Sequence, residues 1–195
     1  MTIAISTQGP DTDWLKTYYY LRFAVSAAWV AVAFTVGMDA PGLAALLLVA
    51  YPAWDSIANY LDASRSGGLA RNRSQMLNFV VSIVTAVAVA ATLSHGMHDV
   101  LKVFGVWASL SGLLQLSTGV RRWKAYGAQW AMIFSGAQSA LAGVFMLKQA
   151  AEAAPVGIAN IAPYAAFGAF YFLISAILLT ISSASRSKAV KAMDV

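Results

Sequence analysis

One stretch of an otherwise apolar chain carries groups that can bind a solute or ionise. Residues 51–62 read YPAWDSIANYLD and combine a carboxylate at Asp55 with an amide at Asn59 and several aromatic rings. A charge inside a hydrophobic segment is costly unless it is paired or wetted, so such residues mark ion pairs, solute sites or proton paths. Asp55 is therefore the residue around which we build the prediction.

The expected partner of Asp55 is Arg22. Asp55 precedes Asp62, at the expected inner end of its helix, by seven residues, or about 10 Å of depth. Arg22 enters from the same side at roughly 5 Å depth, and its long side chain reaches further. We predict an Arg22–Asp55 pair supported by Asn59, with Asn78 as the repeat equivalent of Arg22. Three interpretations stay open: a static pair that orients two helices, a substrate or proton site, or an Arg22 that reaches lipid phosphates instead.

Other residue patterns argue against catalysis and metal binding. The chain has no cysteine, no phosphate-binding glycine loop and no Gly-x-Ser-x-Gly motif. Asp55 and Asp62 lie about two helical turns apart, too far for shared acid–base work. His95 and His98 have only Asp99 nearby, so we expect solvated loop residues and leave a pH-sensing role open. We predict a non-enzymatic protein with no cofactor and no metal site.

The polar residues must be positioned by membrane-spanning helices. The chain is 59% apolar and 11% charged, whereas soluble domains are about 45–50% apolar and about 25% charged. A spanning helix needs about 20 mostly apolar residues. Six stretches qualify: Tyr19–Met38, Gly42–Asp62, Gln75–Ser94, Val100–Val120, Ala125–Leu147 and Pro163–Ala184. The sequence thus predicts an all-α polytopic membrane protein with six transmembrane helices.

The distribution of Lys and Arg predicts the orientation. Eleven of these residues fall on one side of the predicted helices, and two, Lys102 and Lys148, fall on the other. Because short cytoplasmic segments are rich in Lys and Arg, both termini are predicted to be cytoplasmic. The expected parts are an interfacial segment 1–18, a transmembrane domain 19–184 and a basic tail 185–195. The basic residues then face membrane lipids, and a nucleic-acid partner is not expected.

The six helices show a weak internal repeat. Three similar segments, 22–26, 78–82 and 131–135, each end in serine and occupy the same depth of the first, third and fifth helices. Their spacing of about 55 residues corresponds to one helical hairpin. Each hairpin begins and ends on the same side, so we predict three parallel-repeat helical hairpins.

Small residues recur on the fourth and fifth helices and predict close packing there. Such stripes let helix backbones approach in a membrane. Packing inside one chain and a seam in a homo-oligomer are the two interpretations. The residues are Gly105, Ser109, Gly112 and Gly119 on the fourth helix, and Ser135, Ser139 and Gly143 on the fifth.

Two segments carry a family resemblance. Residues 105–119 read GVWASLSGLLQLSTG, and residues 130–143 read WAMIFSGAQSALAG. This glycine pattern resembles the short repeats of HdeD-like membrane proteins (domain of unknown function 308). The resemblance implies a six-helix bacterial inner-membrane protein, with a possible contribution to envelope or acid stress tolerance and no catalytic residues to carry over. Residues 51–62 depart from the pattern.

Two functions therefore compete. The first is a non-enzymatic membrane module of the HdeD-like type. The second is a small transporter or channel that uses the polar site at Arg22 and Asp55. A dry centre around Asp55 would favour the first, and a polar cavity that reaches Asp55 would favour the second.

Overall fold

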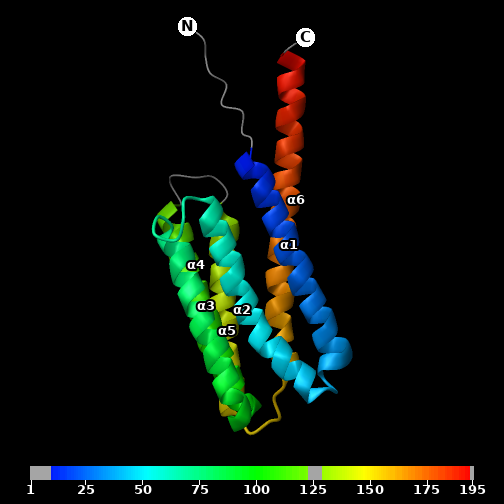
Figure 1. Cartoon of the computed structure of the whole chain (residues 1–195), viewed down its shortest axis with the longest axis vertical. Coiled ribbons are helices and arrows are strands. Elements are labelled where there is room, and N and C mark those ends of the chain that lie inside the picture. Colours follow the sequence, from blue (N-terminus) through cyan, green and yellow to red (C-terminus); the bar gives the residue numbers. More distant parts are fainter. Residues whose placement is uncertain (1–9, 123–128, 194–195) are drawn as a thin grey trace.

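The computed structural model describes residues 10–122 and 129–193, and these form six long helices in one bundle (Figure 1). No strand occurs among the described residues, so the predicted all-α class is confirmed for them. The helices are α1 (Pro10–Val32, extended by a π-helical turn Ala33–Gly37), α2 (Pro41–Arg65), α3 (Arg73–Thr92, followed by a 3₁₀ turn Leu93–His95), α4 (Met97–Arg122), α5 (Gln129–Ala151) and α6 (Ala162–Met193, preceded by a 3₁₀ turn Ile158–Asn160).

The helices have the length and the surface of membrane spans. Five of them, α1 to α4 and α6, are long and apolar enough to cross a bilayer. Large apolar side chains point outwards along the bundle, including Val87 (65% exposed) and Leu141 (70%). A continuous apolar exterior of this kind needs lipid or protein around it. The chain is a multi-pass membrane protein.

Several helix ends differ from the prediction. Helix α1 begins at Pro10 rather than Tyr19, and α6 continues to Met193 rather than Ala184. Hydropathy marks the part of a helix that lies in hydrocarbon, whereas helical hydrogen bonding continues until the backbone is broken. The described parts of the predicted interfacial segment and basic tail, residues 10–18 and 185–193, are therefore helical. Trp123 and Lys124, which belong to the predicted basic side, lie outside the described residues.

The closest helix pairs are offset from the predicted hairpins. The most extensive contacts join α4 to α5, α2 to α3, and α1 to α6, whereas α1–α2, α3–α4 and α5–α6 contact each other less. The start of α1 and the end of α6 lie at the same end of the bundle, which we call the termini end (Figure 1). The first and last helices thus complete the bundle by packing together, and α5 and α6 stand slightly apart.

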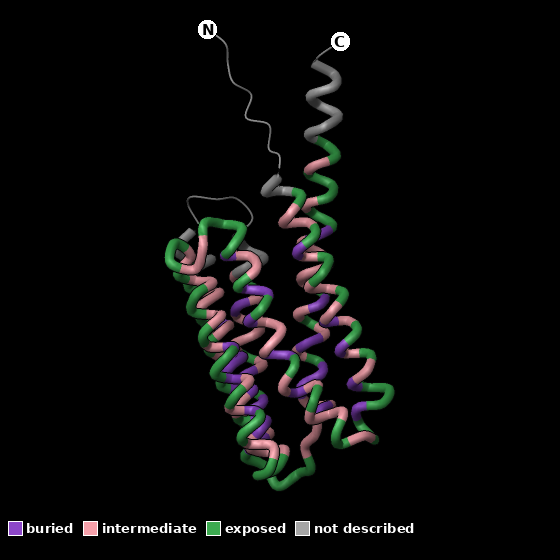
Figure 2. Tube along the Cα trace, in the orientation of Figure 1, coloured by how far each residue is buried: buried purple, intermediate pink, exposed green. Residues whose placement is uncertain are grey.

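The far end of the bundle, opposite the termini, is packed and apolar. Buried residues of the core come from the end of α1, the start of α2, the end of α3, the start of α4, the end of α5 and the start of α6. Figure 2 shows buried residues along the middle and the far end of the bundle. Core members include Leu48, Leu101, Phe104 and Ile161, all with 0% exposure.

Glycines bring α4 and α5 into backbone contact. A Cβ atom added at Gly112 would lie 2.3 Å from the backbone nitrogen of Ala140, and one added at Gly143 would lie 2.3 Å from Ser109 Oγ. Gly105 is similarly close to α5, with 2.9 Å from a built Cβ to the Gly143 carbonyl oxygen.

The remaining small residues of the predicted stripes have different surroundings. The Ser139 hydroxyl donates a hydrogen bond to the carbonyl oxygen of Ala108 on α4 at 2.9 Å. Ser135 lines the cavity described below. Gly119 lies in α4, but its surroundings fall outside the described part. Most of the described stripe thus packs inside the chain.

Candidate functional site

An ion pair between α1 and α2 forms the centre of the site. Arg22 Nη2 donates to Asp55 Oδ1, and the two side chains are only 13% and 17% exposed. Pro52 lies one turn before Asp55 and cannot donate to the Leu48 carbonyl oxygen, which loosens α2 at this point. Trp29 Nε1 on α1 donates to the neighbouring Leu47 carbonyl oxygen at 2.8 Å and so ties α1 to α2 close to this point.

The second oxygen of Asp55 is held by two further donors. Asn59 Nδ2 donates to Asp55 Oδ2 at 3.0 Å, and Ser82 Oγ on α3 donates to the same oxygen at 2.8 Å. Ser82 Oγ in turn accepts a hydrogen bond from Trp107 Nε1 on α4 at 3.1 Å. The carboxylate is therefore stabilised by donors from α1, α2 and α3, and Trp107 ties α4 to this network.

Arg22 is also held by aromatic rings. Its Nη1 donates to the Tyr18 hydroxyl at 3.0 Å, and its Cζ lies 4.2 Å from the centroid of the Phe172 ring on α6. A guanidinium over a ring face is attracted by the ring quadrupole. Nε of Arg22 is buried and has no hydrogen-bond partner among the described residues. One donor of the pair is therefore both buried and unsatisfied among the described residues.

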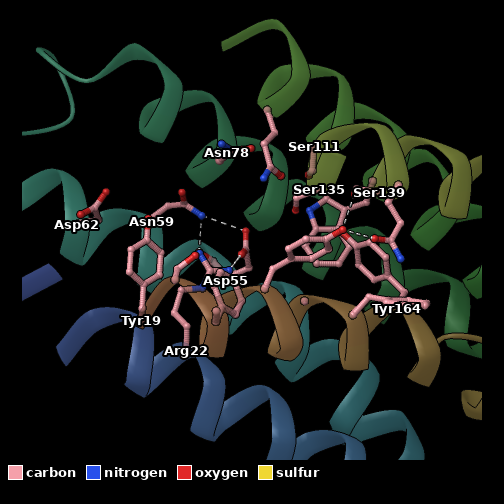
Figure 3. A pocket seen from close by; sticks show the side chains of 18 of the residues that line it. Tyr19, Arg22, Asp55, Asn59, Asp62, Asn78, Ser111, Ser135, Ser139 and Tyr164 are labelled. Carbon is pink, nitrogen blue, oxygen red and sulfur yellow. Dashed lines mark hydrogen bonds and ion pairs between the residues drawn. The ribbon is translucent and has the colours of Figure 1, made fainter. Parts of the chain in front are cut away.

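A cavity of about 460 Å³ opens beside this pair (Figure 3). It reaches from Asp62 and Ser74, near the termini end of α2 and α3, to Tyr51 and Trp107. Tyr51 and Asp62 are eleven residues apart on α2, so the cavity extends about 16 Å along the bundle. The other lining residues are Tyr18, Tyr19, Arg22, Asp55, Asn59, Gln75, Asn78, Ser111, Gln115, Ser135, Gln138, Ser139, Ala142, Tyr164, Phe167, Gly168, Tyr171, Phe172 and Ser175.

All four predicted polar residues line the cavity, but only three of them are joined by hydrogen bonds in the described part of the chain. Arg22, Asp55 and Asn59 form one hydrogen-bonded cluster, with a second bond of 2.8 Å from Asn59 Nδ2 to the Asp55 carbonyl oxygen. Asn78 lines the cavity near Asn59 (Figure 3), but no hydrogen bond joins it to this cluster in the described part of the chain. Asp62 accepts a hydrogen bond from Gln75 Nε2 at 3.1 Å.

Deeper in the cavity, hydroxyl and amide groups connect α5 and α6. Gln138 accepts a hydrogen bond from the Tyr171 hydroxyl at 2.7 Å, and Ser139 lies 3.2 Å from the Tyr164 hydroxyl. Ser111 Oγ on α4 borders the cavity and has no hydrogen-bond partner among the described residues. The deep end thus combines satisfied and free polar groups with ring faces.

Two important members of the site escaped the sequence reasoning. Ser82 was noted only as the last residue of a repeat segment, and Trp107 only within the glycine pattern. Their signal was depth: Ser82 occupies in its helix the position that Ser26 occupies in α1, one turn beyond Arg22. A buried carboxylate needs several donors, so a hydroxyl at that depth was the candidate to seek.

The histidines lie far from this site. His98 Nε2 is 3.1 Å from the Ala154 carbonyl oxygen in the connection to α6, and His95 ends the turn after α3. Among the described residues, no group of three or more His, Cys, Asp or Glu side chains is placed to hold a metal ion. Nothing in this geometry links the two histidines to the cavity.

Ser82→Ala is expected to lower the free energy of unfolding by about 2 kcal/mol, because it removes a donor to Asp55 and leaves the buried Trp107 N–H without an acceptor. Detergent-solubilised protein unfolded in mixed micelles gives the measurement. Ser64→Ala is the matched control: Ser64 is exposed and bonds only the Leu61 carbonyl oxygen of its own helix. Equal losses in the two variants would contradict the assigned role of Ser82.

Comparison with known families found a similarity over part of this chain. Residues 77–148 match the family model described as "Short repeat of unknown function (DUF308)". The resemblance seen in the glycine pattern is thereby confirmed for the region from α3 to α5. Comparisons with curated proteins and with solved structures found no match. The match includes Ser82 and Trp107, whereas Arg22, Asp55, Asn59 and Asp62 lie outside it.

Proposed function

We propose that this short-repeat membrane protein is a small, non-enzymatic transporter of the bacterial inner membrane, with a solute site beside Arg22 and Asp55. The observation that carries the proposal is the cavity of about 460 Å³. Its volume falls within the range of small-molecule sites. A bundle that needed only to pack would fill this space with apolar side chains.

The polar lining supports a wet, functional site. Charged residues within membrane spans are costly and usually face water or mark a transport path. Here Arg22, Asp55 and Asp62 line one cavity together with neutral polar residues such as Asn78 and Gln115. The solute would replace water molecules that hydrate these groups.

The cavity reaches one end of the bundle and not the other, which favours a transporter over an open channel. The cavity reaches the termini end, whereas the far end is filled by the apolar core around Leu101, Phe104 and Ile161. A binding site that is open on one side and closed on the other is the arrangement expected for one state of alternating access. Release to the other side would require the far-end core to separate.

The proposed orientation places the cavity mouth in the cytoplasm. Lys and Arg residues concentrate on the side of the termini, and this excess is typical of cytoplasmic segments. We include α5 as the sixth span because it packs along α4, in the most extensive contact of the bundle. We also propose that the chain consists of three parallel repeats, each of two consecutive helices. In this structure the helices of one repeat pack mainly against helices of the neighbouring repeats.

A second candidate function is supported by the hydrogen bonds of the Asp55 carboxylate, both of whose oxygens already have donors within the chain. Asp55 accepts hydrogen bonds from Arg22, Asn59 and Ser82, so the pair can act as a static link between helices. The protein would then be a non-enzymatic packing module in lipid or a homo-oligomer. A role in envelope or acid stress remains a prediction of the family resemblance alone.

Cysteine labelling tests the proposed cavity, because the chain has no native cysteine. Ser111→Cys is expected to react with a membrane-impermeant methanethiosulfonate in inside-out vesicles and to resist it in intact cells. Leu113→Cys, on the same helix with a 55% exposed side chain on the bundle exterior, is the control and should stay unlabelled from both sides. An unreactive Ser111→Cys in both preparations would favour the packing module.

A further inference from the structure

The charges that line the cavity do not balance. Among its described lining residues the charged side chains are Arg22, Asp55 and Asp62, with no Lys, Glu or His. Arg22 and Asp55 neutralise each other in their ion pair. Asp62 forms no ion pair among the described residues, and its hydrogen-bond partner is the neutral amide of Gln75. One negative charge is therefore left at the mouth of the cavity.

The walls of the cavity are unusually aromatic. Eight lining residues carry rings: Tyr18, Tyr19, Tyr51, Trp107, Tyr164, Phe167, Tyr171 and Phe172. One of these faces already holds a cation, since the Arg22 guanidinium lies 4.2 Å from the Phe172 ring centroid. Ring faces attract cations, and they also provide apolar area for the rest of a ligand.

The basic residues that the structure describes near the mouth, apart from Arg22, do not line the cavity. Arg71 and Arg73 are exposed in and beside the turn between α2 and α3, and the Arg65 guanidinium lies 4.7 Å from the Trp14 ring centroid. Among the described lining residues, the one cation that an anion would meet is Arg22, which Asp55 already holds. The interior therefore favours positive charge, although the surrounding surface is basic.

We infer that the solute is an organic cation with an apolar group, and this inference rests on the proposed function. Its charged group lies at the mouth between the Asp62 carboxylate and the Tyr19 ring, which flank the same part of the cavity (Figure 3). Its apolar part extends inwards towards Tyr51, Trp107 and Tyr164. Their rings form a cluster, with 5.9 Å between the Tyr51 and Trp107 centroids and 5.8 Å between those of Trp107 and Tyr164.

Equilibrium dialysis of the full chain in nanodiscs tests the inference with three probes of similar size. Benzyltrimethylammonium is the cation, phenylmethanesulfonate the anion and benzyl alcohol the neutral compound. The cation is expected to bind at least about tenfold more tightly than the other two, the effect of roughly one charge–charge contact at a partly wetted site. Equal or preferred binding of the anion or the neutral compound would overturn the cation inference and leave the solute site standing.

Single substitutions test which residues bind the charged group of the cation probe. Asp62→Asn keeps an acceptor for Gln75 and is expected to weaken cation binding about tenfold, whereas Tyr19→Leu should weaken it about fivefold through loss of the ring face. Asp99→Asn, the same change at the exposed far end of the bundle, is the matched control and should bind like the parent. Unchanged binding in both cavity variants would overturn the inference. Absence of binding by all three probes would also overturn the cation inference. Labelling of Ser111→Cys would then show separately whether the proposed water-accessible cavity exists.

Discussion

Arg22→Met is expected to lower the free energy of unfolding by about 3–5 kcal/mol, because it leaves the Asp55 carboxylate buried without its cation. Asn59 and Ser82 would still donate to Asp55, but two neutral donors do not replace a guanidinium. Unfolding in mixed micelles, followed by loss of tertiary fluorescence, gives the measurement. The loss should exceed that of Ser82→Ala.

The double variant Arg22→Met/Asp55→Leu separates the cost of an orphaned charge from the value of the pair. Replacing both partners by apolar groups is often nearly neutral, so it should be more stable than Arg22→Met alone. Lys102→Met is the control: the Lys102–Asp99 pair is exposed at the far end, and no measurable change is expected. A double variant no more stable than Arg22→Met would contradict an energetic link between the two residues.

The same double variant shows whether the ion pair takes part in solute binding. If it folds and no longer binds the solute, the pair belongs to the binding machinery. If it folds and binds the cation probe like the parent, the pair is a structural link, and the solute contacts only Asp62 and the aromatic walls.

The second large effect is expected at Gly112 on α4. Gly112→Ala should lower the free energy of unfolding by about 3 kcal/mol, the upper end of the usual cost of overpacking. The added Cβ would meet backbone atoms, with Ala140 N at 2.3 Å and the Gly136 carbonyl oxygen at 2.6 Å, and backbone cannot move aside as a flexible side chain can. The two helices must separate to admit the methyl group.

Gly42→Ala is the matched control for this prediction. Gly42 lies in the first turn of α2, and a built Cβ meets nothing within 4 Å, so no loss of stability is expected. Mass measurement in nanodiscs adds a second readout. A Gly112→Ala variant with unchanged stability but a changed oligomeric mass would contradict packing inside the chain and would place the glycine stripe at a seam between copies.

The sequence predicted the helical class well because the period and length of apolar segments report directly on membrane spans. It predicted helix ends less well: the expected interfacial segment 1–18 was separate from the first span, yet residues 10–18 lie within α1. It also did not predict the pairing of α1 with α6, because hydropathy carries no information on which apolar faces meet.

The centre of the site was more predictable than its walls. Asp55 and Arg22 stand out because a charge in hydrocarbon has few structural explanations, and their depth along the helices suggested the pair. The cavity could not be predicted, since it depends on the gap between α5 and α6 and on rings from both. Tyr164 and Tyr171 look like ordinary apolar helix residues until that gap is known.

The packing of α1 against α6 has a consequence for synthesis of the protein. Asp55 emerges from the ribosome soon after Arg22, so the charged pair can form while the chain is still short. The wall that α6 contributes, with Phe167, Tyr171 and Phe172, arrives last. A nascent or truncated chain can thus neutralise its buried charges early and still lack the wall that α6 contributes to the cavity.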